Sequence, residues 1–354
     1  MKKLVLAATI VALSGSALAR DVLRVFNWNN EIAPVTIKRF EAQCKCDVQE
    51  DYYGDSEEML AKLAAGATGY DMVVPTTYAM QALIKQGKTQ PLDRAKLPNF
   101  ANLNAGYLKL NAPFDPGNAV GAPLLASITA LGYNSEKMRA LGIPTDSWAA
   151  VFDPKYLSKL KGRVTVLDSQ RELMSAALMY LGRDANSTSP ADLQAAAAVI
   201  RKAKPYWAAF NNQSYIKELT VGNIWLVHGF TNDFFQAMHD AKAAKRNFTI
   251  GYNLQKEGNI LGLDNLVILK NAKRPDLALQ FINFLLDGKN AADVSNIMGS
   301  VNPNRAALSY LQPEIRANKV IMADPSRDKL VLLKDLGAKD RRELNRLWTE
   351  IKAR

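Results

Sequence analysis

The segment of residues 22–34 most constrains what this chain can fold into. Val22 to Phe26 is an apolar run rich in residues that favour strands. A polar turn follows, and Pro34 then opens a helical pattern, because proline suits the first helical turn. A strand, a loop and a helix in this order place the loop at the carboxyl end of the strand, where open α/β sheets bind ligands. We therefore expect Trp28 and Glu31 at the mouth of a binding site, where an aromatic face beside a carboxylate suits a cation.

The same order of strand and helix recurs along the chain. It predicts an α/β fold with two lobes, each a doubly wound sheet with helices, and 354 residues are enough for both. Two long extended runs are expected to cross between the lobes. The predicted strands are 48–53, 70–74, 164–167 and 224–228, the crossing runs are 121–133 and 260–269, and the predicted helices begin at Pro34, at a cap on Asp55, at Ala79, at Arg171, at Pro190 after a cap on Ser189, after Pro275 and at Asp340.

The first nineteen residues have the pattern of a secretory signal peptide. Two lysines precede an apolar run from Leu4 to Leu13, and Ala17-Leu18-Ala19 is a small-residue cleavage motif. The apolar run is too short to span a bilayer. We expect cleavage after Ala19 and a mature protein that is exported to the periplasm.

The net charge excludes little by itself. It is +11 for the whole chain and becomes +9 once the two signal-peptide lysines are removed, since that segment holds no acid. The basic residues are scattered and no groove-reading motif accompanies them, so we expect a solvated basic surface and no nucleic-acid partner.

The two cysteines, Cys44 and Cys46, are separated by one residue. An oxidising compartment favours a disulfide, whereas the short spacing makes a tight ring, so the spacing leaves both states open. A metal site is not expected, because His228 and His239 lie far away in the sequence.

Motifs for catalysis and cofactor binding are missing. The chain has no G-x-S-x-G, Walker, H-E-x-x-H or G-x-G-x-x-G motif, and two histidines leave little room for a histidine triad. Paired carboxylates keep a secreted hydrolase open as an alternative. We expect a binding protein with no enzymatic activity and no cofactor.

Several ordered landmarks coincide in the mature chain: Asn27-Trp28-x-x-x-Ile32-x-Pro34, the run from Tyr70 to Tyr78, Leu167-Asp168-x-x-x-Glu172, Glu257-Gly258 followed by Asp264, and Asn283 to Leu286. With these landmarks, nearly all of residues 20–354 resemble the periplasmic spermidine/putrescine-binding proteins of bacterial ABC importers. The resemblance implies the type II periplasmic binding fold, a polyamine held between two lobes by carboxylates and aromatic faces, a membrane permease as partner, and a monomer.

The resemblance also assigns site residues. Thr76 replaces a serine of the family and Phe230 replaces a tryptophan, whereas the other assigned positions match. With Glu31 added from its place in the loop, the predicted ligand-binding residues are Trp28, Glu31, Thr76, Tyr78, Glu172, Phe230, Asp233 and Asp264.

Four positions depart from the family pattern. Glu31 occupies the place of a tyrosine, Ser169 that of an aspartate in spermidine-type members, Gly262 that of an aromatic residue, and Ser300 that of a tyrosine. The lost aromatic walls open the pocket, and Glu31 adds negative charge. The ligand therefore stays open between putrescine or spermidine and another cationic amine, such as agmatine or an ω-amino acid. We expect one lobe to contain residues 20–128 and 264–305, and the other residues 129–263 and 306–354.

Overall fold

The structure, a computed structural model, describes residues 20–28, 31–53, 56–160 and 162–353. The predicted signal peptide with its cleavage after Ala19 lies outside these residues, as does the predicted helix cap at Asp55. Within the described ranges, no helix is both long and apolar enough to cross a membrane.

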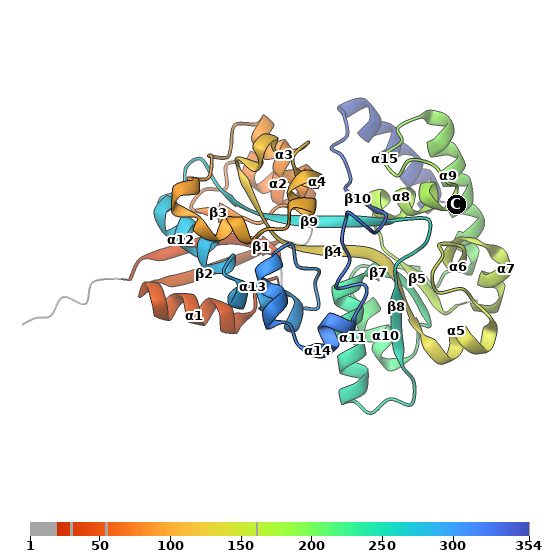
Figure 1. The fold of residues 1–354 in the computed structure, drawn as a ribbon. Coiled ribbons are helices and arrows are strands. Elements are labelled where there is room, and N and C mark those ends of the chain that lie inside the picture. Colours follow the sequence, from red (N-terminus) through yellow and green to blue (C-terminus); the bar gives the residue numbers. More distant parts are fainter. Residues whose placement is uncertain (1–19, 29–30, 54–55, 161, 354) are drawn as a thin grey trace, which may run out of the picture.

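The described strands form one hydrogen-bonded sheet (Figure 1). Its order is β2-β1-β3-β9-β4-β7-β5-β6, with β10 beside β9 and β8 beside β4. The strands are β1 (Val22–Trp28), β2 (Asp47–Tyr53), β3 (Met72–Val73), β4 (Gly121–Asn134), β5 (Val164–Val166), β6 (Ala209–Phe210), β7 (Leu226–Phe230), β8 (Ile250–Asn253), β9 (Asn259–Ile268) and β10 (Leu330–Val331).

Two long strands join the halves of the molecule. β1 pairs in parallel with β2 and β3, and β5 pairs in parallel with β6 and β7, whereas β4 is antiparallel to β7, β8 and β9. In Figure 1, β4 and β9 run through both halves. The predicted two-lobed α/β class and its crossing strands are confirmed, and these strands connect the sheets of the two lobes into one. The residues at which the lobes divide stay a prediction.

Helices cover both halves. In Figure 1, α1 to α4, α12 and α13 surround β1 to β3, and α5 to α11 together with α15 surround β5 to β8. The helices are α1 (Pro34–Cys44), α2 (Ser56–Ala64), α3 (Thr77–Lys85), α4 (Ala105–Asn111), α5 (Ser135–Leu141), α6 (Ala149–Phe152), α7 (Pro154–Leu157), α8 (Gln170–Tyr180), α9 (Pro190–Ala203), α10 (Tyr215–Val221), α11 (Thr231–Ala243), α12 (Pro275–Leu285), α13 (Gly288–Asn296), α14 (Pro313–Ala317) and α15 (Ala338–Ala353).

Local chemistry explains several helix starts, and one predicted strand ends later than expected. Helices α1, α9 and α12 begin at the predicted prolines. Ser189 precedes α9 but makes no side-chain capping hydrogen bond. The strand predicted at 224–228 is β7, which runs to Phe230 because the backbone there pairs with Thr129 of β4. Helix α11 begins directly after this strand, at Thr231.

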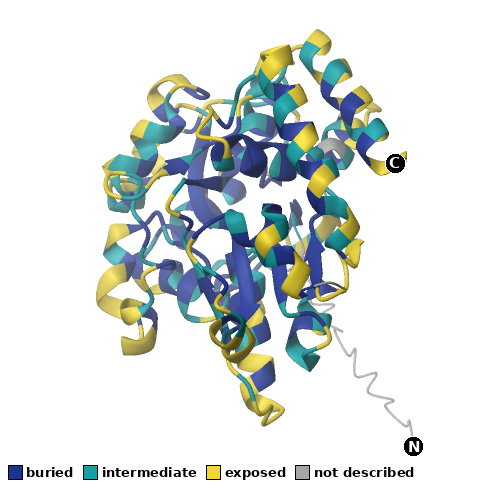
Figure 2. Ribbon diagram, turned by 90° about the vertical axis from the view of Figure 1, so that its right-hand side faces the viewer, coloured by how far each residue is buried: buried dark blue, intermediate teal, exposed yellow. Residues whose placement is uncertain are grey.

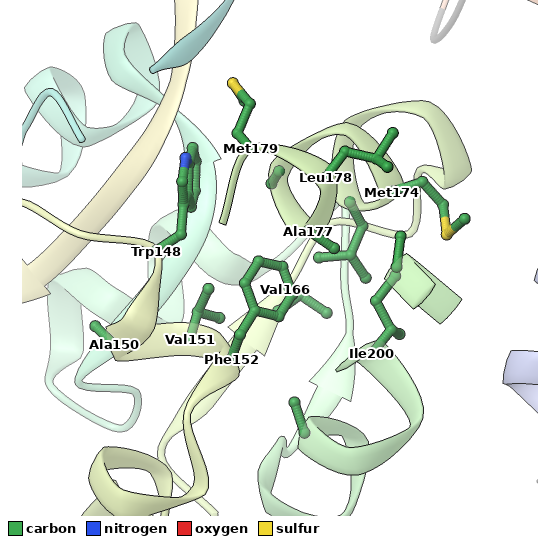
Figure 3. Close-up of a cluster of buried hydrophobic side chains, with 14 of the residues drawn as sticks. Trp148, Ala150, Val151, Phe152, Val166, Met174, Ala177, Leu178, Met179 and Ile200 are labelled. Carbon is green, nitrogen blue, oxygen red and sulfur yellow. The ribbon is translucent and has the colours of Figure 1, made fainter. Parts of the chain in front are cut away.

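Each half has its own apolar core, with buried strands inside and exposed helix faces outside (Figure 2). Figure 3 shows the core beside β5, where Trp148 and Phe152 pack near Val166. Fully burying one large apolar side chain of this kind contributes about 1.5–3 kcal/mol. Gly132 allows the close approach of α11 to β4, because a Cβ atom there would lie 2.3 Å from the Phe234 ring.

Cys44 and Cys46 form a disulfide at the end of α1, with their Cα atoms 5.2 Å apart. Lys45 between them adopts a left-handed backbone conformation (φ 55°) that ends the helix. His228 is completely buried in β7, and burial lowers the pKa of its imidazole to about 3. It is therefore a neutral core residue, and His239 is exposed on α11.

Candidate functional site

Two aromatic residues end neighbouring parallel strands. Trp28 closes β1 and Tyr53 closes β2, and the two residues are register partners with ring centroids 4.7 Å apart. The Tyr53 hydroxyl donates to the carbonyl of Val74 at 2.6 Å, which fixes its ring. The sequence prediction missed Tyr53, although an aromatic residue at the end of the second strand, matching Trp28 at the end of the first, was a usable signal.

Two carboxyl groups meet beside the Trp28 indole. Asp264 lies in β9 and is 4% exposed, and Glu31 lies in the turn before α1. The pKa of Glu31 is raised by burial first and then by the charge of Asp264. Burial likewise raises the pKa of Asp264.

These groups leave polar atoms unsatisfied. Oε2 of Glu31, Oδ1 of Asp264 and Nε1 of Trp28 are buried and have no hydrogen-bond partner among the described residues. No lysine or arginine in the described ranges influences the pKa of Glu31 or of Asp264. A buried, unpaired carboxylate is costly unless a cation or donor reaches it. This end of the site is therefore built to receive positive charge.

Thr76 and Tyr78 border the same carboxyl pair. The backbone of Thr76 forms an isolated β-bridge with Asp264, and its hydroxyl lies 3.0 Å from the Ser56 hydroxyl. Tyr78, on α3, is close enough for its phenol to raise the pKa of Tyr53. The structure thus brings Trp28, Glu31, Thr76 and Tyr78 together around Asp264.

A second acidic group belongs to the other half of the molecule. Glu172 lies in the first turn of α8, where a negative charge is favoured by the helix dipole. Thr129 of β4 donates its hydroxyl to Glu172 Oε2 at 2.6 Å. Burial raises the pKa of Glu172, while this hydrogen bond and the charge of Arg171 lower it. The hydroxyl of Ser169 accepts from the Glu172 backbone amide at 3.4 Å and so caps the helix.

Phe230 lies next to this group, and Asp233 follows three residues later in the chain. Phe230 is the register partner of Thr129, and Asp233 follows in the first turn of α11. The Tyr215 hydroxyl donates to the Asp233 carboxylate. Burial raises the pKa of Asp233 to about 6, partly opposed by this hydrogen bond.

Strand β4 sets the distance between the two acidic groups. Asp264 pairs with Leu125 of β4, and Phe230 pairs with Thr129, four residues farther along the strand. Four residues of extended strand span about 13 Å. Acidic groups therefore lie at both ends of one stretch of β4, an arrangement that suits a linear ligand with a cation at each end.

An open cleft of about 530 Å³ lies where α2 and α3 face α8 and α15. Tyr78 lines it from one side, and Gln170 and Arg171 line it from the other. The Arg171 guanidinium lies 5.8 Å from the centre of the Tyr78 ring. A separate small cavity of about 10 Å³ is lined by Glu31 together with Thr36 of α1 and Asp293 of α13.

No cluster of three or more histidine, cysteine, aspartate or glutamate side chains within the described ranges could hold a metal ion.

The molecule has two lobes joined by crossing strands, with acidic and aromatic groups at their junction. This arrangement defines its class, which is a binding protein for a cationic solute.

Comparisons with known proteins agree with this class. Residues 36–323 match the family model described as bacterial extracellular solute-binding protein. The putrescine/cadaverine-binding protein of Pseudomonas aeruginosa is 49% identical, with 100% of each chain covered. The putrescine-binding periplasmic protein of Escherichia coli is 35% identical over 98% of this chain and 96% of its own. A solved structure titled putative spermidine/putrescine ABC transporter from Listeria monocytogenes superposes with a TM-score of 0.82 and 29% identity, covering 94% of this chain and 99% of that one.

The chain belongs to the bacterial extracellular solute-binding proteins, and within them to the polyamine-binding components of ABC importers. This family binds solutes and performs no catalysis, so the secreted hydrolase is excluded.

Proposed function

We propose that this chain captures a linear aliphatic polyamine, with putrescine and cadaverine as the first candidates, and delivers it to a membrane permease. Its 49% identity to the putrescine/cadaverine-binding protein over the full chain supports this ligand class. The eight predicted residues hold the ligand: Trp28, Glu31, Thr76, Tyr78, Glu172, Phe230, Asp233 and Asp264.

One observation carries the proposal. The carboxyl groups of Glu31 and Asp264 lie together beside the Trp28 side chain, and each has a buried oxygen without a partner among the described residues. One ammonium with three N–H donors satisfies both oxygens and neutralises their repulsion. The second ammonium is then expected at Glu172 and Asp233.

The negative charge at both ends of the proposed site also ranks the alternative ligands. An ω-amino acid would direct its own carboxylate at one of the acidic groups, which is repulsive. Agmatine, which is cationic at both ends, keeps a match, and a Pseudomonas aeruginosa relative that is 34% identical is named a putrescine/agmatine-binding protein. Agmatine therefore remains the second candidate.

Isothermal titration calorimetry of the mature protein tests the proposal. The ligands are putrescine, cadaverine, spermidine, agmatine and 5-aminopentanoate, with pentane-1,5-diol as an uncharged control that has the length of cadaverine. We expect micromolar or tighter binding of at least one diamine and no heat from the diol. Binding of 5-aminopentanoate alone, or of none of the amines, would refute the proposal.

Export and transport complete the proposal. The pattern of residues 1–19 and the periplasmic names of two relatives support export with cleavage after Ala19. Mass spectrometry of the protein from a periplasmic extract should give an N-terminus at Arg20. A monomer that presents both lobes to one permease is the expected form, and light scattering with and without diamine measures it.

A further inference from the structure

The two crossing strands are almost completely buried, except at one point that they share. Within β4 and β9, both of which the structure describes in full, Ser127 and Gly262 are the only residues that are not buried. They are direct register partners in the antiparallel pair. Within these two strands, only the Ser127–Gly262 pair is therefore appreciably exposed to solvent.

This step lies between the two acidic groups. Ser127 is two residues from Leu125, the partner of Asp264, and two residues from Thr129, which holds Glu172. Residues two apart on a strand, and residues directly opposite on an antiparallel partner, share one face of the sheet. Ser127 and Gly262 therefore form the floor midway along the path between the acidic ends.

Gly262 makes room for the Ser127 hydroxyl. A Cβ atom at position 262 would lie 3.2 Å from Ser127 Oγ, so a side chain there and this hydroxyl would compete for the same space. Among the described residues the hydroxyl has no hydrogen-bond partner, and it is free to face a ligand.

The middle of the ligand decides what this hydroxyl does. A diamine places only methylene groups in the middle, and these strip water from the hydroxyl without replacing its hydrogen bonds, which is unfavourable. An amine nitrogen in the middle can donate to Ser127 Oγ instead.

We infer that Ser127, exposed by Gly262, is a specificity-determining residue that selects polyamines with an internal nitrogen over diamines of the same length. The inference rests on the proposed function, because it assumes that the terminal ammonium groups occupy the two acidic ends.

Two ligand pairs of matched length test it. Cadaverine and diethylenetriamine differ by one central CH₂ replaced by NH, and octane-1,8-diamine and spermidine differ in the same way. Calorimetry compares each pair on the wild type, on Ser127→Ala and on Gly262→Ala. The alanine at 262 keeps the hydroxyl but crowds it.

We expect Ser127→Ala to weaken the internal-nitrogen member of at least one pair by about tenfold, the value of one good hydrogen bond, and its all-carbon partner by less than twofold. Gly262→Ala should likewise weaken binding of the internal-nitrogen ligand more than binding of its all-carbon partner. Thermal unfolding of both variants checks that they fold, and binding of the all-carbon partners reports an intact site.

If Ser127→Ala weakened both ligands of each pair equally, or neither, the inference would be overturned. The hydroxyl would then only hold water. Binding of diamines by the wild type with no binding of either internal-nitrogen ligand would also overturn it, while leaving the proposed function in place. Absence of binding by every amine would instead refute the proposed function.

Discussion

Two buried aspartates show how the surroundings of one residue type separate structure from function. Asp71 is 2% exposed and accepts hydrogen bonds from the backbone amides of Arg24, Lys273 and Arg274 at 2.8–3.0 Å. Asp264 is equally buried, but one of its oxygens has no partner among the described residues. The first carboxylate is satisfied by its own fold, whereas the second one needs a ligand.

Exchange of each aspartate for asparagine should therefore have opposite effects. Asp264→Asn removes the charge that faces the ligand, so we expect diamine affinity to fall more than 100-fold, in line with about 3–5 kcal/mol for breaking a buried pair. The empty protein should keep or gain thermal stability, because an uncompensated buried charge is lost. Calorimetry and thermal unfolding measure the two quantities.

Asp71→Asn is the matched control. It should lower the unfolding temperature, because an acceptor of backbone amides becomes a poorer one, and leave the affinity of the folded protein unchanged. Loss of binding in Asp71→Asn, or unchanged affinity in Asp264→Asn, would contradict the assignment of Asp264 to the site.

The raised carboxyl pKa values predict opposite pH trends for stability and binding. Asp233 has a pKa of about 6 in the folded chain and an ordinary value of 3.8, so between these values the folded state holds more protons than the unfolded state. Its contribution to the free energy of unfolding therefore falls as the pH rises through this window. An ammonium ligand binds the ionised form, so affinity should rise over the same range.

Thermal unfolding from pH 5 to pH 8, with and without diamine, measures both trends. The comparison with Asp233→Asn isolates this group, since the variant should lose part of both slopes. A ligand-induced rise in unfolding temperature that shrinks as pH increases would show that the site does not bind a cation through ionised carboxylates.

At the level of elements, the sequence predicted what is local. Pro34, Pro190 and Pro275 mark helix starts because proline acts on its own backbone. The strand predicted at 224–228 runs on to Phe230, because the end of β7 is set by its pairing with β4, which no local pattern reveals. Trp28, Glu31 and Tyr78 could be predicted as candidate site residues from their place at strand ends, whereas Glu172 and Asp233 came from the resemblance to the family. The contact between Glu31 and Asp264, and the support of Glu172 by Thr129, depend on segments far apart in the chain and could not be predicted.

Thr129 is the link between β4 and α8 at the site. Thr129→Val keeps the shape of the side chain but removes the donor that holds Glu172 Oε2 at 2.6 Å. We expect ligand affinity to fall by about tenfold, because a hydrogen bond to a charged group contributes about 1.5–3 kcal/mol. Part of the loss should be recovered at higher pH, since the pKa of Glu172 rises further without this donor. Calorimetry at pH 7 and pH 8.5 measures both effects.

Thr165→Val provides the control for this change. Thr165 is a buried threonine on β5 whose hydroxyl has no partner in the described part of the chain, so its replacement should leave affinity unchanged and stability unchanged or raised. Equal affinity losses in the two variants would mean that Thr129 acts through packing and not through Glu172.

Over the whole molecule, the halves also touch outside the ligand site. Lys85 on α3 pairs with Asp335 at 3.3 Å, and Arg341 on α15 pairs with the other oxygen of Asp335 at 3.1 Å. The adjoining Lys334 is held to the α8 half, because its carbonyl accepts from Arg171 at 2.7 Å. The Lys85–Asp335 pair therefore spans the cleft between α3 and the segment before α15.

Asp335→Asn should weaken the contact between the two halves. Lys85 is 61% exposed, so the pair contributes at most about 1 kcal/mol, and ligand dissociation should become two- to fivefold faster with little change in the association rate. Stopped-flow fluorescence of the tryptophans measures both rates.

The control is Asp168→Asn, which removes an ion pair with Lys352 inside one half of the molecule and should leave both rates unchanged. An equal effect of the two variants would show that the pair across the cleft has no special part in closure. High salt should remove the difference between wild type and Asp335→Asn, because exposed ion pairs are screened.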